Sequence, residues 1–443
     1  MKHILLAVVV LGVVIGALPC ASFAEEPAFR GKVDLSYRYR SDGNETDQDM
    51  RQYLSLSYFR PWEKAEAEVG VVFAGMLQED IDGRNTGEGF YQFSELADSY
   101  DSATMGWLYL AYAEISTRNT LELMRFGRQE LMEFEPIAFD GALASARVNK
   151  KISIWAYGGV PVNLYETDCS GDSLIGSHVV LRPAKNLFFM VGYLGLRDEV
   201  KLADETETKL HDDLIFIRAF WRASRNLSLM TKSSLLDSEF RDASISATYR
   251  NYDYDFNLNV FYKAQFIERE AQTSLEDPFS LILGPYRPYH SGGVSAYKGI
   301  GEYFGVEAGA FFKQLFENDD ESTYNHNYQR YLLSLFLYKV PFSKSEWVVG
   351  ADYWVSPGDA ETYTVRGEYS QKLGKRGRFK AGTSYDLYKV NLITGEEDED
   401  VRTYYVGLLL PFGKHFYLGV DYRFEDGSAR EVDTIETRVG YEF

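Results

Sequence analysis

Apolar and polar side chains alternate along most of this chain, in segments of roughly ten residues between Phe29 and Phe443. Charged and hydroxyl side chains alternate with apolar ones within segment 32–40, whose apolar face carries Val33, Leu35, Tyr37 and Tyr39. A period of two places successive side chains on opposite faces of a β-strand. Similar segments, each of which we interpret as a strand, lie at 257–266, 362–373, 378–390 and 416–425.

Two kinds of link join these segments. Short links lie at 60–65, 116–119, 149–151, 182–186, 223–226, 251–255, 298–302, 340–346, 373–377 and 411–415. Between them lie mostly longer and often acidic links, at 41–49, 78–106, 161–175, 198–210, 267–291, 317–326 and 391–401. Short turns at one end and long loops at the other are typical of outer-membrane barrels.

These patterns predict an all-β fold: a transmembrane, antiparallel, up-and-down β-barrel of about 22 strands, within a range of roughly 18 to 26. In such a barrel the apolar face of each strand meets lipid and the polar face lines a wet lumen. The first strand begins soon after the predicted leader, so we expect no plug domain. A constriction would then come from a loop or a partner, and links 78–106 and 267–291 are long enough to narrow the pore.

The first 24 residues read as a secretory signal peptide. Lys2 and His3 precede an apolar run over 4–18, which at about 15 residues is shorter than the ~20 needed to span a bilayer. Ser22 and Ala24 place small residues at the two positions that a signal peptidase reads, which predicts cleavage after Ala24. We therefore predict a signal peptide at 1–24, a barrel at 25–443 and a location in the cell outer membrane.

The last segment alternates up to the final residue, with Ile435, Thr437, Val439, Tyr441 and Phe443 on one face. It must pair with the strand near Phe29, because an open strand edge cannot lie in lipid. A final strand that ends in an aromatic residue resembles the signal read by the barrel assembly machinery. We predict that Tyr441 and Phe443 form that signal.

Composition narrows the function. The chain carries 33 Tyr and 29 Phe, residues that favour strands and membrane interfaces. Its formal net charge of −20 argues against a nucleic-acid partner. Cleavage after Ala24 would leave Cys169 as the single cysteine, so no internal disulfide, metal pair or haem motif is expected. We predict no cofactor.

No catalytic motif stands out. The chain has six His without a His-x-x-x-His pair, and it lacks a Gly-x-Ser-x-Gly elbow and a phosphate-binding glycine loop. His211 beside Asp212 and Asp213 is the one arrangement that resembles a rim site of barrel enzymes. A loop histidine with satisfied hydrogen bonds is the better explanation, so we do not expect an enzyme.

The polar strand faces supply the candidates for function, because charges on these strands need water or partners. Both signs are present, which suits neutral or polyhydroxy solutes. From the alternation, the pore-lining candidates are Arg38, Arg250, Lys263, Lys313, Arg366, Glu368, Lys380, Asp421, Arg423 and Arg438.

One stretch resembles a known family. The segments 122–131 (ELMRFGRQEL) and 138–142 (AFDGA) are similar to the Gly-Arg-Gln…Phe-Asp-Gly pattern of alginate-export-type outer-membrane porins. In that family the matching arginines line a positive pore for an anionic polysaccharide. The resemblance therefore implies that Arg125, Arg128 and Arg147 line the pore.

Our first hypothesis is an outer-membrane channel for hydrophilic solutes or an exported polysaccharide. The alternative is a scaffold barrel that sheathes a periplasmic or lumenal partner protein, such as a multihaem cytochrome in an electron conduit. Either barrel would have outer-membrane lipid, lipopolysaccharide and the assembly machinery as partners.

Overall fold

A computed structural model of the protein describes residues 28–63, 66–82, 103–117, 119–131, 137–162, 171–201, 207–267, 288–316, 327–355, 361–390, 397–428 and 430–443. The predicted signal peptide at 1–24, most of links 78–106 and 267–291, and Cys169 lie outside these residues. Within the described ranges no helix is long and apolar enough to cross a membrane.

All the named elements are β-strands, and they form one sheet. The strands are β1 (Ala28–Ser41), β2 (Thr46–Trp62), β3 (Ala67–Asp80), β4 (Thr104–Thr117), β5 (Leu121–Leu131), β6 (Ile137–Asn149), β7 (Ile152–Pro161), β8 (Ser173–Ala184), β9 (Leu187–Lys201), β10 (Glu207–Arg222), β11 (Leu227–Leu236), β12 (Glu239–Asn251), β13 (Phe256–Gln265), β14 (Tyr289–Ile300), β15 (Phe304–Leu315), β16 (Tyr328–Tyr338), β17 (Ser345–Val355), β18 (Glu361–Leu373), β19 (Gly377–Val390), β20 (Glu397–Phe412), β21 (Phe416–Asp426) and β22 (Glu431–Glu442).

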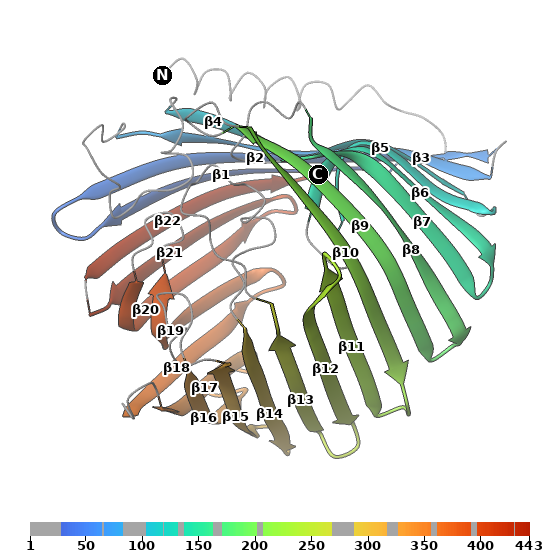
Figure 1. Ribbon diagram of the computed structural model, residues 1–443. Helices are drawn as coiled ribbons and strands as arrows, with labels where there is room; N and C mark the ends of the chain where they lie inside the picture. Colours follow the sequence, from blue (N-terminus) through green and yellow to red (C-terminus); the bar gives the residue numbers. More distant parts are fainter. Residues whose placement is uncertain are drawn as a thin grey trace.

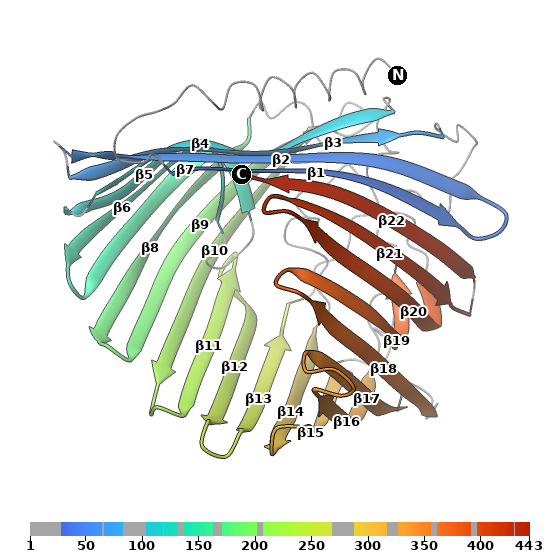
Figure 2. The same ribbon diagram turned by 180° about the vertical axis from the view of Figure 1, so that it is seen from behind.

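The sheet closes on itself. Each strand pairs antiparallel with the next, and β22 returns to pair with β1 over Lys32–Ser41 (Figures 1 and 2). The main chains of Gly31 and Phe443 exchange two hydrogen bonds of 2.9 and 3.0 Å at this seam. The prediction of a closed, up-and-down barrel with 22 strands is confirmed, and the described residues contain no plug.

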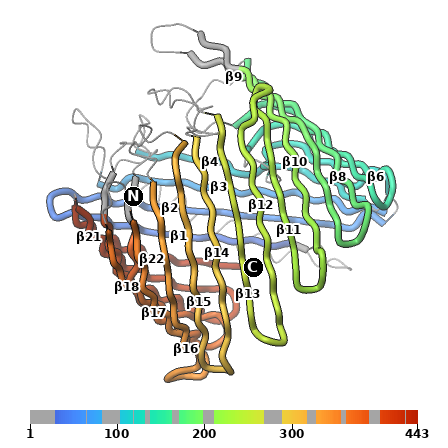
Figure 3. Tube along the Cα trace, turned by 60° about the horizontal axis from the view of Figure 1, so that its bottom comes forward, coloured from blue at the N-terminus to red at the C-terminus, as the bar shows by residue number. Residues whose placement is uncertain are grey.

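The predicted short links are turns of the barrel. The turns between β12 and β13 and between β14 and β15 lie at the same end (Figure 3). One expected long link is shorter than predicted, because β1 and β2 extend until only residues 42–45 separate them. The acidic residue Asp42 accepts hydrogen bonds from the backbone N–H groups of Asn44 and Glu45, at 2.9 and 2.7 Å, which closes this turn.

The two faces of the sheet differ in character. Directly paired residues of antiparallel strands share a face, so the register carries one face around the whole ring. On the outer face, large apolar side chains lie uncovered, among them Ile175 (66% exposed) and Val365 (62%). Uncovered apolar side chains around a closed barrel are those that meet lipid. If the outer face met water instead of lipid, this much exposed apolar surface would drive aggregation.

The inner face is itself divided. From β5 to β11 it carries a buried apolar cluster, which we call the inner core: Leu131, Ile137, Phe139, Leu143, Tyr157, Leu174, Leu194, Leu196, Leu214 and Leu236. Cross-strand pairs such as Leu194 with Leu214 and Leu214 with Leu236 build it. Alternation predicts a polar lumen throughout, so this packed part of the inner face is a difference that alternation alone does not reveal.

Candidate functional site: the charged inner wall

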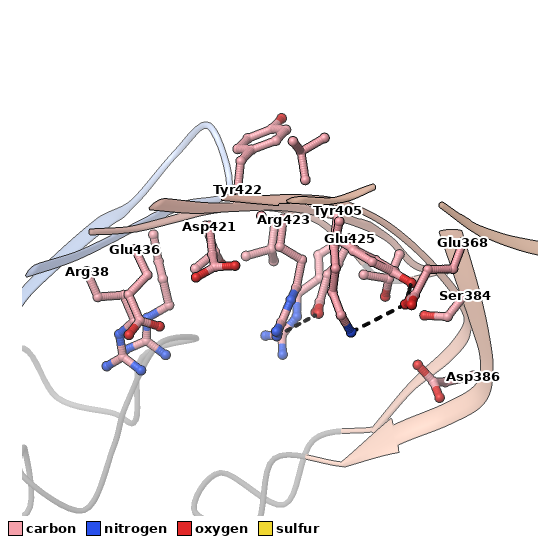
Figure 4. Close-up of a pocket in the computed structure, with 18 residues that line it drawn as sticks. Arg38, Glu368, Ser384, Asp386, Tyr405, Asp421, Tyr422, Arg423, Glu425 and Glu436 are labelled. Carbon is pink, nitrogen blue, oxygen red and sulfur yellow. Dashed lines mark hydrogen bonds and ion pairs between the residues drawn. The ribbon is translucent and has the colours of Figure 1, made fainter. Parts of the chain in front are cut away.

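A hollow of about 820 Å³ opens on the inner face (Figure 4). Its lining is charged and polar, in contrast to the apolar inner core. We call the strands that bound it, β1 and β18–β22, the charged wall. Figure 4 shows Asp421 and Arg423 on the hollow's side of the sheet, whereas the ring of Tyr422 points to the other side. The charged and hydroxyl residues that line it are Arg38, Arg40, Glu368, Lys380, Ser384, Asp386, Thr403, Tyr405, Asp421, Arg423, Glu425, Arg430, Thr434 and Glu436.

The strongest anchor of the wall is a network around Asp49. The register places Arg38 opposite Asp49, and Arg38 Nε donates to Asp49 Oδ2 at 3.2 Å. Gln78 Nε2 donates to the other carboxylate oxygen at 2.9 Å. One step along, Arg40 pairs with Asp47 at 2.6 Å. The side chain of Asp49 is only 5% exposed, so its charge depends on these partners.

Other charges of the wall also form pairs. Glu368 accepts a hydrogen bond from the Tyr405 hydroxyl at 2.7 Å and lies 3.6 Å from Lys380 Nζ. Arg423 pairs with its strand neighbour Glu425 at 3.7 Å. Each of these groups keeps a side chain that is more than one fifth exposed, so water reaches them. The wall is thus polar, hydrated and close to charge balance.

A second network lies farther round the ring, on β16–β18. Asp352 accepts a hydrogen bond from Arg330, whose Nη2 lies 2.7 Å from Oδ1, and Arg366 Nε lies at the ion-pair distance of 3.3 Å from Oδ2. The Arg330 guanidinium also lies 4.7 Å from the ring centroid of Trp354, a cation–π distance. The predicted candidate Arg366 therefore faces the same side as the charged wall, within an ion-pair network.

Two of the arginines carried over from the family resemblance take opposite faces. Arg125 shares a face with Glu114 and pairs with it at 2.5 Å. Arg128 lies three residues further on, which puts it on the outer face beside Phe126, where it forms a two-pronged pair with Asp140 at 2.6 and 2.8 Å. Residue spacing explains this, because positions three apart in a strand face opposite ways.

The other candidates are spread along the barrel. Arg147 pairs with Glu122 at the short-turn end of β6 and is half exposed. Arg438 pairs with Glu436 at 2.7 Å beside the hollow. Arg250 lies near the turn that follows β12, opposite Asn257. Lys263 and Lys313 lie far from the charged wall, on β13 and β15.

The candidate list missed several residues of the hollow, including Arg40, Glu425 and Glu436. Alternation could have found each of them, because they lie two residues from Arg38, Arg423 and Arg438 on the same strands. Sequence spacing does not give their partners. Those depend on the register between strands that are up to several hundred residues apart, as for Arg38 and Glu436.

His211 lies on the outer face near the loop end. Its Nε2 is 3.4 Å from Asp213, and its Nδ1 is 3.1 Å from the Leu196 carbonyl oxygen. The Tyr193 hydroxyl donates to the same Asp213 at 2.5 Å. In the part of the chain that the structure describes, no group of three or more His, Cys, Asp or Glu side chains is placed to hold a metal ion.

The C-terminal aromatics pack at the closing seam. The ring of Phe443 lies 5.4 Å from that of Phe29, and the ring of Tyr441 lies 4.5 Å from that of Phe416. A Cβ at Gly31 would lie 2.1 Å from the Phe443 ring, so only glycine leaves room for it. The role of Tyr441 and Phe443 in assembly remains a prediction.

Taken together, a closed antiparallel barrel, an apolar outer face and a hydrated, charged inner wall define a transmembrane β-barrel of the outer-membrane type. The chain is similar to solved structures from Pseudomonas aeruginosa, one of which is the outer membrane protein OpdK (TM-score 0.44, 12% identity over 95% of this chain and 100% of that one). OccK8 (OprE) matches with a TM-score of 0.48 and 9% identity over 96% of this chain and 99% of that one. OccK3 (OpdO) matches with 0.45 and 10% over 94% and 95%. OpdK, solved with vanillate, matches with 0.44 and 11% over 94% and 98%.

No family model matches the chain, and no curated protein matches its sequence. The resemblance of 122–142 to alginate-export-type porins therefore stays a prediction from the sequence.

Proposed function

We propose that the protein is an outer-membrane channel through which small hydrophilic solutes move passively along the charged wall. The observation that carries this proposal is the hollow of about 820 Å³ bounded by paired charges of both signs. Dense side-chain hydrogen-bonding groups can replace part of a solute's hydration shell, whereas the apolar inner core of β5–β11 cannot.

Charge balance favours polar solutes over a single class of ion. Arg38, Arg40, Lys380 and Arg423 are each matched by a carboxylate within 4.0 Å. Passage of an exported polysaccharide along the same wall, as the family resemblance implies, is the longer-chain version of this proposal.

Conductance of the purified protein in planar lipid bilayers tests the proposal. We expect stepwise single-channel currents, and swelling of liposomes in sugars up to a size limit that excludes larger sugars. Refolded protein that gives neither current in planar bilayers nor sugar entry into liposomes would overturn the channel proposal. A co-purified haem protein that fills the lumen would instead support the sheath alternative.

A further inference from the structure

A second set of inner-face residues runs across seven strands on the side away from the charged wall. The register joins them in one line from β10 to β16. We call this line the basic row, and its members are Arg218, Lys232, Ser244, Lys263, Ser291, Lys313 and Tyr328. Four of the seven are cations, three bear hydroxyls and none is a carboxylate.

The row lies on the inner face by the same register argument. Lys313 is paired with Tyr328 and therefore shares its face. Arg330 lies two residues from Tyr328 on β16, so it is on that face too. Arg330 and Arg366 both pair with Asp352, which places this face on the inside of the barrel. Directly paired residues share a face, so Lys263 and Ser291 point inward as well. Lys263 and Lys313 each lie two residues from the loop end of their strands, about 7 Å along the strand.

The lysines of the row differ from the cations of the charged wall. Lys232, Lys263 and Lys313 form no ion pair with any residue that the structure describes. Lys263 Nζ and Lys313 Nζ instead approach the same ring, at 5.5 and 5.0 Å from the centroid of Tyr289. Two ammonium groups over one aromatic ring are held by its quadrupole but not neutralised by it.

In the part of the chain that the structure describes, the two rows that flank Lys263 and Lys313 supply no carboxylate that pairs with either lysine. The row beside it towards the short turns reads Phe220, Met230, Ser246, Phe261, Gly293, Phe311 and Arg330. The row on the loop side contains one carboxylate, Asp242, which pairs with Arg241 at 2.9 Å. Lysines within the barrel that have no described ion-pair partner raise the local concentration of anions.

We infer that the basic row is an oxyanion-binding site for phosphate or a phosphate ester, centred on Lys263, Ser291 and Lys313. Ammonium and hydroxyl groups, which both donate hydrogen bonds to phosphate oxygens, alternate along the row in the order Lys263, Ser291, Lys313 and Tyr328. Lysine binds phosphate as a point charge, whereas planar carboxylates are matched best by the arginine fork. This inference rests on the proposed channel function and names a class of solute that the channel would bind, although binding itself does not require conduction.

Calorimetric titration of inorganic phosphate into the full chain in detergent tests the site without any need for current. The double variant Lys263→Gln, Lys313→Gln removes both central charges, and we expect it to weaken phosphate binding at least roughly tenfold. The matched control, Lys150→Gln with Lys151→Gln, removes two exposed charges at the short turn between β6 and β7 and should leave binding within about twofold. Heat-modified gel mobility checks that each variant is folded.

Absence of saturable phosphate binding to the wild-type protein overturns the site, as does an equal loss in the control. Acetate that binds as tightly as phosphate overturns the preference for a tetrahedral oxyanion. Phosphate binding without conductance would keep the site and reject the channel, whereas conductance without phosphate binding would do the reverse.

Discussion

Single charged residues of this barrel are stabilised by their neighbours to very different degrees. Asp49 is 5% exposed and has both Arg38 and Gln78 as partners, whereas Glu302 in the turn after β14 is 74% exposed and pairs with Lys339. The hydrogen bond from Lys339 lowers the pKa of Glu302, but solvent screens this exposed pair. The network around Asp49 is therefore where removal of a charge should matter.

Replacement of Arg38 by Met should lower the free energy of unfolding by about 2 kcal/mol, because it leaves the Asp49 carboxylate buried without its main partner. The double variant Arg38→Met, Asp49→Asn should cost less than Arg38→Met alone. Urea titration followed by tryptophan fluorescence in lipid vesicles measures both. Lys339→Met serves as the exposed control and should change little; single and double variants of equal stability would contradict the coupling.

At this scale, the sequence revealed faces but not partners. A period of two correctly groups Arg38 with Arg40, and it also separates Arg125 from Arg128, which the family resemblance had grouped together. The ion pairs themselves join strands through registers that no local pattern encodes. The basic row illustrates this, because its seven members come from seven separate segments.

Among the strands, β5, β6 and β7 meet at a line of paired glycines. The register aligns Gly127, Gly141 and Gly159 on neighbouring strands. A Cβ at Gly141 would lie 2.1 Å from the Gly158 carbonyl oxygen, and one at Gly159 would lie 2.2 Å from that of Asp140. Backbone atoms cannot move aside as a flexible side chain can.

Gly141→Ala should therefore lower the free energy of unfolding by about 1–3 kcal/mol, since it forces two backbones apart. Gly367→Ala on β18 is the matched control, because its nearest new contact would be 3.8 Å away. The same urea titration reports both variants. If Gly141→Ala is as stable as Gly367→Ala, the close packing of β6 and β7 is not a constraint.

Strands and turns were the most predictable part of this protein. Alternation, link lengths and the short turns gave the strand number and the antiparallel order, because both depend on patterns within some ten or twenty residues. The β1–β2 link was expected to be longer, since its acidic composition resembles a loop although Asp42 closes a four-residue turn.

For the whole molecule, the sequence predicted a polar lumen throughout, whereas the inner face of the structure carries both an apolar cluster and charged regions. The inner core packs Leu194, Leu214 and Leu236 against one another, while the charged wall borders the hollow. This asymmetry arises because the alternate positions of β5–β11 carry leucines on the inner face at the loop end.

The central claim is that one face of each strand lines a water-filled path and the other meets lipid. Neighbouring residues Asp421 and Tyr422 test it, since they point to opposite sides of the same strand (Figure 4). We would introduce Asp421→Cys and Tyr422→Cys separately into a chain in which Cys169 is replaced by Ser, and record single-channel current in planar bilayers while a charged, membrane-impermeant thiol reagent is added. Modification should reduce the current of Asp421→Cys and leave that of Tyr422→Cys unchanged. An unmodified Asp421→Cys, or a current that falls equally in both variants, would contradict the arrangement of a wet inner wall and a lipid-facing exterior.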